Sequence, residues 1–212
     1  MLLVLCAVLA ALGVLTLLHA HLQDPAVAQF DLEMQRTVHG WASPGLDVPM
    51  RALSWLGSIK IFGSALAGGV AVLLWQRMRY AAALLGLPML GALVLNETLK
   101  LHFQRARPTV PWAIGDEHTF SFPSGHSLFS VVLYGTLAYL ALQRPTPAWR
   151  RVALLLAAII LPLAIGLSRI YLGMHFPTDV LAGYSVGVIW LGLTVVVDRA
   201  WRAGPTTSHP FP

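Results

Sequence analysis

The sequence contains six continuous apolar segments, each near the roughly 20 residues that a helix needs to cross a bilayer. They cover residues 2–20, 53–75, 80–101, 126–142, 152–168 and 179–197. Each segment is apolar throughout rather than in alternation, and a helix satisfies its own backbone hydrogen bonds in lipid. The sequence therefore predicts an all-α, polytopic membrane protein built as a bundle of six transmembrane helices.

Composition supports a membrane protein over a soluble one. Charged residues make up 11% of the chain, against roughly 25% in soluble domains. The length of 212 residues fits one domain, so we expect a single membrane domain over residues 1–202. A short disordered tail, rich in Pro and Thr, would follow over residues 203–212. Cys6 is the only cysteine, which excludes an intrachain disulfide and a cysteine-based metal site.

The net charge of +5 raises nucleic acid as a possible partner. The arginines, however, lie mainly in short connections between apolar segments and form no long basic face for a duplex. Seven of them fall on one predicted side of the membrane: Arg77, Arg79, Arg144, Arg150, Arg151, Arg199 and Arg202. The positive-inside rule makes that side cytoplasmic. We expect a multi-pass protein of the inner (plasma) membrane that binds no nucleic acid.

The opposite side, facing the periplasm or exterior, carries residues 21–52 and 102–125. Its acidic residues are Asp24, Asp31, Glu33, Asp47, Asp116 and Glu117. It also holds four basic residues that weaken the charge asymmetry: Lys100, Arg105, Arg107 and Arg169. Basic residues retained on the outer side usually have another role.

Two segments allow alternatives. Residues 1–20 are either a first span or a cleaved signal peptide, although they lack a basic n-region and exceed a usual h-region in length. Residues 26–52 are amphipathic in places, with apolar side chains at Phe30, Leu32, Met34, Val38 and Trp41. Such a segment either lies along the outer interface or is an ordinary loop.

Three polar clusters stand at the outer ends of the predicted helices, where a folded bundle can bring them together. The first is Lys100, Arg107 and Pro108; the second is Pro123, Ser124, Gly125 and His126; the third is Ser168, Arg169, His175 and Asp179. Taken singly, each has an ordinary structural interpretation, as an interfacial anchor, a turn or a structural hydrogen bond. Ionisable residues at such depth are costly, and three clusters on one face indicate a site.

The first chemistry that these clusters support is phosphate binding. Lys100, Arg107 and Arg169 supply three positive charges, and the guanidinium groups match phosphate oxygens. Ser124 can cap a helix, and Gly125 lets the backbone approach an anion at the free helical amides.

The second is nucleophilic catalysis. His175 and Asp179 share a face if they lie on one helix, whereas a helix that begins only near Pro177 requires the loop to join them. A carboxylate on one imidazole nitrogen leaves the other free to attack. His126 then remains as a general acid for the leaving alcohol.

The three clusters together resemble the signature of the type 2 phosphatidic acid phosphatase (PAP2) superfamily. Six residues separate Lys100 from Arg107-Pro108, five separate Arg169 from His175, and three separate His175 from Asp179. The motifs occupy residues 100–179, and the six-helix arrangement extends the resemblance over nearly the whole chain. No position departs from the signature.

The resemblance implies a role for each residue. His175 would become phosphorylated, Asp179 would orient it, and His126 would protonate the leaving group. Phosphate would be held by Lys100, Arg107, Ser124, Gly125 and Arg169. The resemblance also implies that neither a metal nor a cofactor is needed.

The expected function is therefore hydrolysis of a membrane lipid phosphate, such as undecaprenyl diphosphate, phosphatidylglycerol phosphate or phosphatidic acid. One alternative is a lipid phosphotransferase that uses the same phosphohistidine. Oxidation chemistry is a third possibility, because related soluble enzymes hold vanadate in the same pocket, but six membrane segments and a short site loop argue against it. A non-catalytic, transporter-like bundle is a fourth, and the complete set of site residues argues against it.

Several other polar residues have less specific expectations. Asn96 and Glu97 either hold Lys100 in place or pack. Lys60 is expected to snorkel to the interface rather than contact a headgroup. His102 and His118 are expected in loops, and Arg105 is expected to bind a lipid headgroup or face water.

Overall fold

The computed structural model describes residues 2–114 and 119–203, and these ranges form helices and no strand. The helices are α1 (Leu2–His21), α2 (Pro25–His39), α3 (Pro44–Leu56), α4 (Ile59–Trp75), α5 (Arg79–Phe103), α6 (Gly125–Leu142), α7 (Ala148–Tyr171) and α8 (Pro177–Ala203). The all-α prediction is confirmed. Expectations for Asp116, Glu117, His118 and the tail from residue 204 fall outside the described residues.

Five of these helices, namely α1, α5, α6, α7 and α8, are long and apolar enough to cross a membrane. The count becomes six if α3 and α4 form one broken span, bent by 50°. The prediction of one continuous apolar helix over residues 53–75 was therefore wrong, because residues 53–56 belong to α3 and residues 59–75 form α4. Gly57 ends α3 by donating its backbone N–H to Leu53, and the Ser58 hydroxyl accepts from the Ile61 N–H to start α4.

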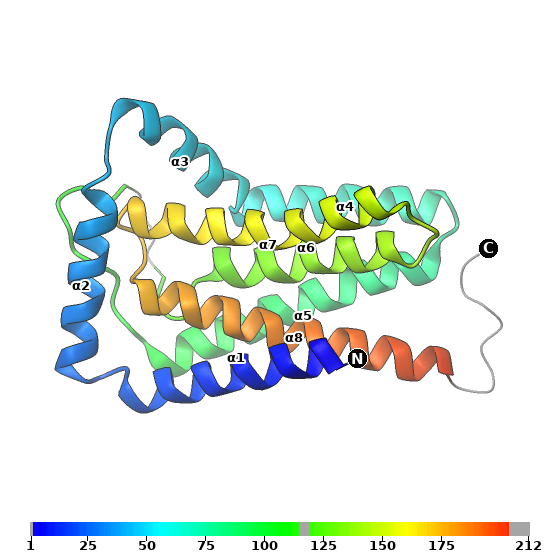
Figure 1. The fold of residues 1–212 in the computed structure, drawn as a ribbon, viewed down its shortest axis with the longest axis horizontal. Helices are drawn as coiled ribbons and strands as arrows, with labels where there is room; N and C mark the ends of the chain where they lie inside the picture. Colours follow the sequence, from blue (N-terminus) through cyan, green and yellow to red (C-terminus); the bar gives the residue numbers. More distant parts are fainter. Residues whose placement is uncertain (1, 115–118, 204–212) are drawn as a thin grey trace.

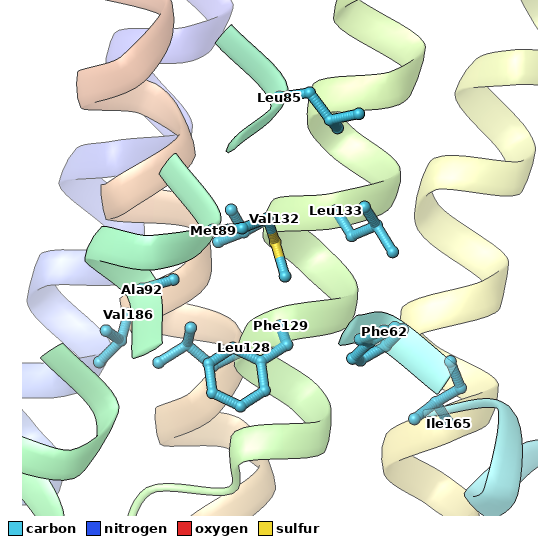
Figure 2. Close-up of a cluster of buried hydrophobic side chains, with 10 residues drawn as sticks. All are labelled: Phe62, Leu85, Met89, Ala92, Leu128, Phe129, Val132, Leu133, Ile165 and Val186. Atoms are coloured by element: carbon cyan, nitrogen blue, oxygen red, sulfur yellow. The ribbon is translucent and has the colours of Figure 1, made fainter. Parts of the chain in front are cut away.

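Helix α6 lies at the centre of the bundle and packs against α5, α7 and α8. Its inward side chains meet those of its neighbours in a buried apolar cluster (Figure 2). Small residues bring α8 close to α6, as is common between membrane helices. A Cβ atom built on Gly183 would lie 2.5 Å from the Ser124 carbonyl oxygen, so the two backbones are nearly in contact.

The outer surface of the bundle is apolar. Large side chains such as Leu87, Val94, Ile159 and Val197 are exposed along α5, α7 and α8. A soluble monomer rarely exposes so continuous an apolar surface. The chain is a multi-pass membrane protein, with lipid as the partner of this surface.

Residues 25–56 form two helices, so the alternative of an ordinary loop was wrong. Helix α2 lies crosswise over one end of the bundle, and α3 leads from it to α4 (Figure 1). Phe30 and Met34 on α2 are exposed, whereas Asp31 and Gln35 are fully buried. The helix is amphipathic as predicted, but polar side chains form much of the face that it packs on the bundle.

The arginine-rich connections lie at the opposite end from α2. The α4–α5 and α6–α7 connections and the end of α8 are all at that end (Figure 1). The helix ends that carry the three polar clusters lie beside α2 instead. The fold therefore separates the basic connections from the predicted site by the length of the bundle.

Candidate active site

A cavity of about 730 Å³ opens at the end of the bundle where α2 and α3 lie. Six of the eight predicted site residues line it: Lys100, Arg107, Gly125, His126, Arg169 and His175. The other two, Ser124 and Asp179, are fully buried and do not line the cavity. Three clusters that are distant in sequence thus meet at one cavity, which we expected from their positions at the outer ends of the predicted helices.

Arg107 connects the cationic part of the cavity to His175. Its Nη1 atom lies 3.2 Å from His175 Nε2 and donates to the Met174 carbonyl oxygen at 2.9 Å. Its Nε atom donates to the Thr119 carbonyl oxygen at 2.8 Å, and Nη2 donates to the Thr119 hydroxyl at 3.0 Å. Lys100 Nζ donates to the same hydroxyl at 3.2 Å. Thr119 therefore joins the two cations, a role that the sequence motifs did not indicate.

Arg169 is the most deeply placed arginine of the site, with 4% of its surface exposed. Its Nη1 atom donates to the Ser54 hydroxyl of α3 at 2.6 Å. Its carbonyl oxygen accepts from the backbone N–H groups of Met174 and His175, which closes the turn after α7. Arg169 thus links α3, the cavity and the histidine loop.

His175 lies in the loop before α8, because α8 begins only at Pro177. Proline suits the first turn of a helix and ends the preceding loop there. The loop brings His175 Nδ1 to 3.5 Å from Asp179 Oδ2. The same Oδ2 atom accepts from the Phe176 N–H at 2.9 Å, so Asp179 also caps α8. Its distance to His175 is longer than a good hydrogen bond, and such contacts often tighten when substrate binds.

Arg105 has a role that the sequence did not predict, because its guanidinium pairs with two buried carboxylates. Only 15% of its side chain is exposed. Nη1 donates to Asp179 Oδ1 at 2.6 Å, and Nη2 donates to Asp31 Oδ2 at 2.6 Å. Asp31 also accepts from the backbone N–H of Thr178 at 3.0 Å and from its hydroxyl at 2.6 Å. Arg105 and Asp31 thus hold the far side of Asp179.

Helix α2 reaches the histidine loop at a second point. Gln35 is fully buried, and its Nε2 atom donates to the His175 carbonyl oxygen at 3.2 Å. Sequence reasoning missed both Asp31 and Gln35, since they lie far from the motifs. The available signal was their spacing: two polar residues at i and i+4 share one face of a helix.

The start of α6 places His126 and the helical amides at the cavity. Ser124 is the N-cap residue, but its side chain makes no capping hydrogen bond; its hydroxyl accepts from Ser127 at 3.2 Å instead. The backbone N–H of Ser124 donates to the Asp179 carbonyl oxygen at 2.9 Å. Gly125 is tightly enclosed, since an added Cβ would lie 3.3 Å from Asn96 Nδ2.

The remaining polar residues divide into cavity-lining and peripheral ones. Asn96 is buried and donates to Glu97 at 3.1 Å, and both line the cavity. Lys60 also lines the cavity, although we expected it to snorkel to the membrane interface. His102 was expected in a loop, and this was wrong, because it is an exposed residue in the last turn of α5. Over residues 2–114 and 119–203, no group of three or more His, Cys, Asp or Glu side chains is placed to hold a metal ion.

Two histidines and clustered cations thus line one cavity at the end of a helical bundle, an arrangement suited to binding and transferring a phosphoryl group. Residues 80–203, more than half of the chain, match the sequence model of the PAP2 superfamily. The chain therefore belongs to the PAP2 superfamily and is a phosphatase.

Comparison with individual proteins supports the same family. The chain is 29% identical over 184 residues to phosphatidylglycerophosphatase B of Bacillus subtilis (strain 168), covering 86% of this chain and 90% of that protein. It is 29% identical over 121 residues to the undecaprenyl-diphosphatase of Sulfolobus acidocaldarius, covering 55% and 54%. The crystal structure of a transmembrane PAP2 type phosphatidylglycerolphosphate phosphatase from Bacillus subtilis superposes with a TM-score of 0.85 at 26% identity, covering 94% and 98%.

Proposed function

We propose that the protein is a membrane lipid phosphatase that acts through a phosphohistidine intermediate on His175. The observation that carries the proposal is the placement of His175 Nε2 in a cavity with three cations. Arg107 lies 3.2 Å from this atom, and Lys100 and Arg169 line the same cavity. Asp179 stands on the other side of the ring, at Nδ1.

In the first half-reaction, Nε2 of neutral His175 attacks the phosphorus atom. A P–N bond forms, the P–O bond to the leaving group breaks, and His126 gives its proton to the departing oxygen. Lys100, Arg107 and Arg169 stabilise the charge on the phosphoryl oxygens, together with amides at the start of α6. Asp179 stabilises the ring as it becomes positively charged.

In the second half-reaction, water attacks the phosphorus atom of the phosphohistidine. His126, now neutral, accepts a proton from this water, and the P–N bond breaks. Inorganic phosphate leaves, and both histidines return to their starting protonation states. One histidine must be neutral and the other protonated, so the rate has a bell-shaped dependence on pH. The two limbs belong to the coupled pair rather than to single residues.

The network behind Asp179 has a positioning role in this proposal. Arg105 takes one carboxylate oxygen of Asp179 and leaves the other directed at His175 and the start of α8. Asp31 in turn holds Arg105 from α2. Helix α2, the segment after α5 and the start of α8 therefore together determine how the His175 imidazole is oriented.

The substrate we propose is a phosphomonoester or diphosphate headgroup on a membrane lipid. The names of the relatives indicate phosphatidylglycerol phosphate and undecaprenyl diphosphate as members of this class, and phosphatidic acid is a simpler one. The cavity opens at the end of an apolar bundle, where a headgroup can enter while its chains stay in lipid. The arginine-rich connections at the other end favour an active site that faces the periplasm or exterior.

Phosphate release by the purified protein tests this function. Lipid phosphates of each kind would be supplied in detergent with excess EDTA, because the charge on the phosphoryl group is met by side chains rather than metal ions. We expect phosphate release from at least one lipid and none from the His175→Ala variant. Activity lost in EDTA and restored by magnesium would overturn the mechanism. Transfer of labelled phosphate to a lipid hydroxyl instead of water would show a phosphotransferase.

A further inference from the structure

Two basic side chains line the cavity outside the proposed phosphate site. Arg51 belongs to α3, and Lys60 belongs to the first turn of α4. Both are exposed, and neither belongs to the motifs of the family. Their side chains form no ion pair or hydrogen bond with any other described residue. Three cations already serve the transferring phosphoryl group, so these two have no assigned role.

The position of the α3–α4 break indicates that Arg51 and Lys60 lie on the leaving-group side of the cavity. Gly57 at the break lies against His126, since a Cβ atom built on Gly57 would be 3.1 Å from His126 Cδ2. Lys60 lies in the first turn of α4, three residues after Gly57, and Arg51 lies on α3, six residues before Gly57. Arg51, Lys60 and the histidine proposed to protonate the leaving group line the same cavity.

The charge balance of the cavity favours an anionic group at this position. The described residues that line the cavity include five Lys or Arg side chains: Arg51, Lys60, Lys100, Arg107 and Arg169. Glu97 is the only acidic residue among them, and it accepts a hydrogen bond from Asn96. The transferring phosphoryl group carries about two negative charges at neutral pH, which leaves an excess of positive charge in the cavity.

We propose that Arg51 and Lys60 form a subsite for a second anionic group, one that departs with the leaving group. The preferred substrate is then a lipid diphosphate or a phosphomonoester attached to a lipid phosphodiester, because both leave a negatively charged product beside His126. A lipid with a single phosphate leaves a neutral alcohol and gains nothing from the subsite. The inference rests on the proposed phosphatase function and on the role of His126 within it.

The test compares two lipids with the same chain, a polyprenyl diphosphate and the corresponding polyprenyl monophosphate. The kcat/KM for phosphate release would be measured for wild type and for the double variant Arg51→Gln, Lys60→Gln. We expect the ratio of diphosphate to monophosphate to fall about tenfold or more, since charge-assisted hydrogen bonds are lost with one lipid only. The same ratio measured for phosphatidylglycerol phosphate against phosphatidic acid should also fall.

Arg36→Gln is the matched control, because Arg36 is exposed on α2 at the same end of the bundle but does not line the cavity. It should leave both ratios unchanged. A double variant that lowers kcat/KM equally for both lipids, or for neither, would overturn the subsite while the phosphatase function stands. A wild-type enzyme that releases phosphate from none of these lipids would overturn the proposed function and the subsite with it. Thermal melting in detergent would establish that the variants remain folded.

Discussion

Replacing Asp31 by Asn probes whether α2 contributes to catalysis or only to the fold. Asp31 is fully buried and accepts three hydrogen bonds, one from Arg105 and two from Thr178. The amide keeps one acceptor oxygen but loses the charge that pairs with Arg105. Breaking a buried ion pair costs roughly 3–5 kcal/mol, and the retained acceptor favours the lower end. We expect a loss of stability of about 3 kcal/mol.

The catalytic effect should be separate from the loss of stability. Without the Asp31 carboxylate, Arg105 keeps its contacts with Asp179, Thr178 and the Phe176 ring but loses a second anchoring charge, and the Asp179 carboxylate can turn away from His175. We expect kcat to fall about tenfold, which corresponds to about 1.4 kcal/mol. The KM should stay near its wild-type value, because Asp31 does not line the cavity.

The opposite end of the bundle offers a matched control. Asp198 is also buried, pairs with Arg202 at 3.0 Å, and accepts hydrogen bonds from Tyr80 and Tyr139. Asp198→Asn should lower the midpoint of thermal unfolding to a similar extent without changing kcat. The kcat and KM of both variants would be measured on folded protein in detergent. A wild-type kcat in Asp31→Asn, or an equal loss of kcat in Asp198→Asn, would refute the positioning role.

Three further predictions concern the leaving group, the α3–α4 break and the orientation of the bundle. His126→Ala should slow hydrolysis of a natural lipid phosphate by at least about 100-fold, and a substrate with a better leaving group should recover part of the rate; wild-type speed would remove its assigned role. Gly57→Ala should cost about 1–3 kcal/mol through overpacking and lower activity, as activity and melting assays would show. In a background without Cys6, the Arg36→Cys variant should react with an impermeant thiol reagent in intact cells, and the Arg150→Cys variant should react only after lysis. The reverse labelling pattern would show that the predicted topology is inverted.

Much of the architecture followed from the sequence because lipid imposes simple requirements. An apolar stretch of about 20 residues can satisfy its backbone only as a helix, so α1, α5, α6, α7 and α8 were predictable as elements. The break between α3 and α4 was harder to predict. Hydropathy continues through Gly57 and Ser58, and only the capping interactions at these two residues divide the helices.

Part of the candidate site was also predictable from the sequence. The residues that position the motif side chains were not. His175 and Arg107 carry motif spacings, so their convergence could be expected. Asp31 and Arg105 could not be paired from the sequence, because their ion pair depends on α2 folding back over the end of the bundle. Thr119 has no distinguishing pattern, yet both Lys100 and Arg107 bond to it.

The central claim is that His175 carries the phosphoryl group during turnover. Rapid mixing with a lipid labelled in its terminal phosphate, followed by an alkaline quench, tests it most directly, because phosphohistidine survives alkali and is lost in acid. Label should be found on the peptide that contains His175 and should decay as free phosphate is released. The His175→Ala protein should carry no label. Label on another residue, or full turnover with no labelled protein at any time point, would contradict the account.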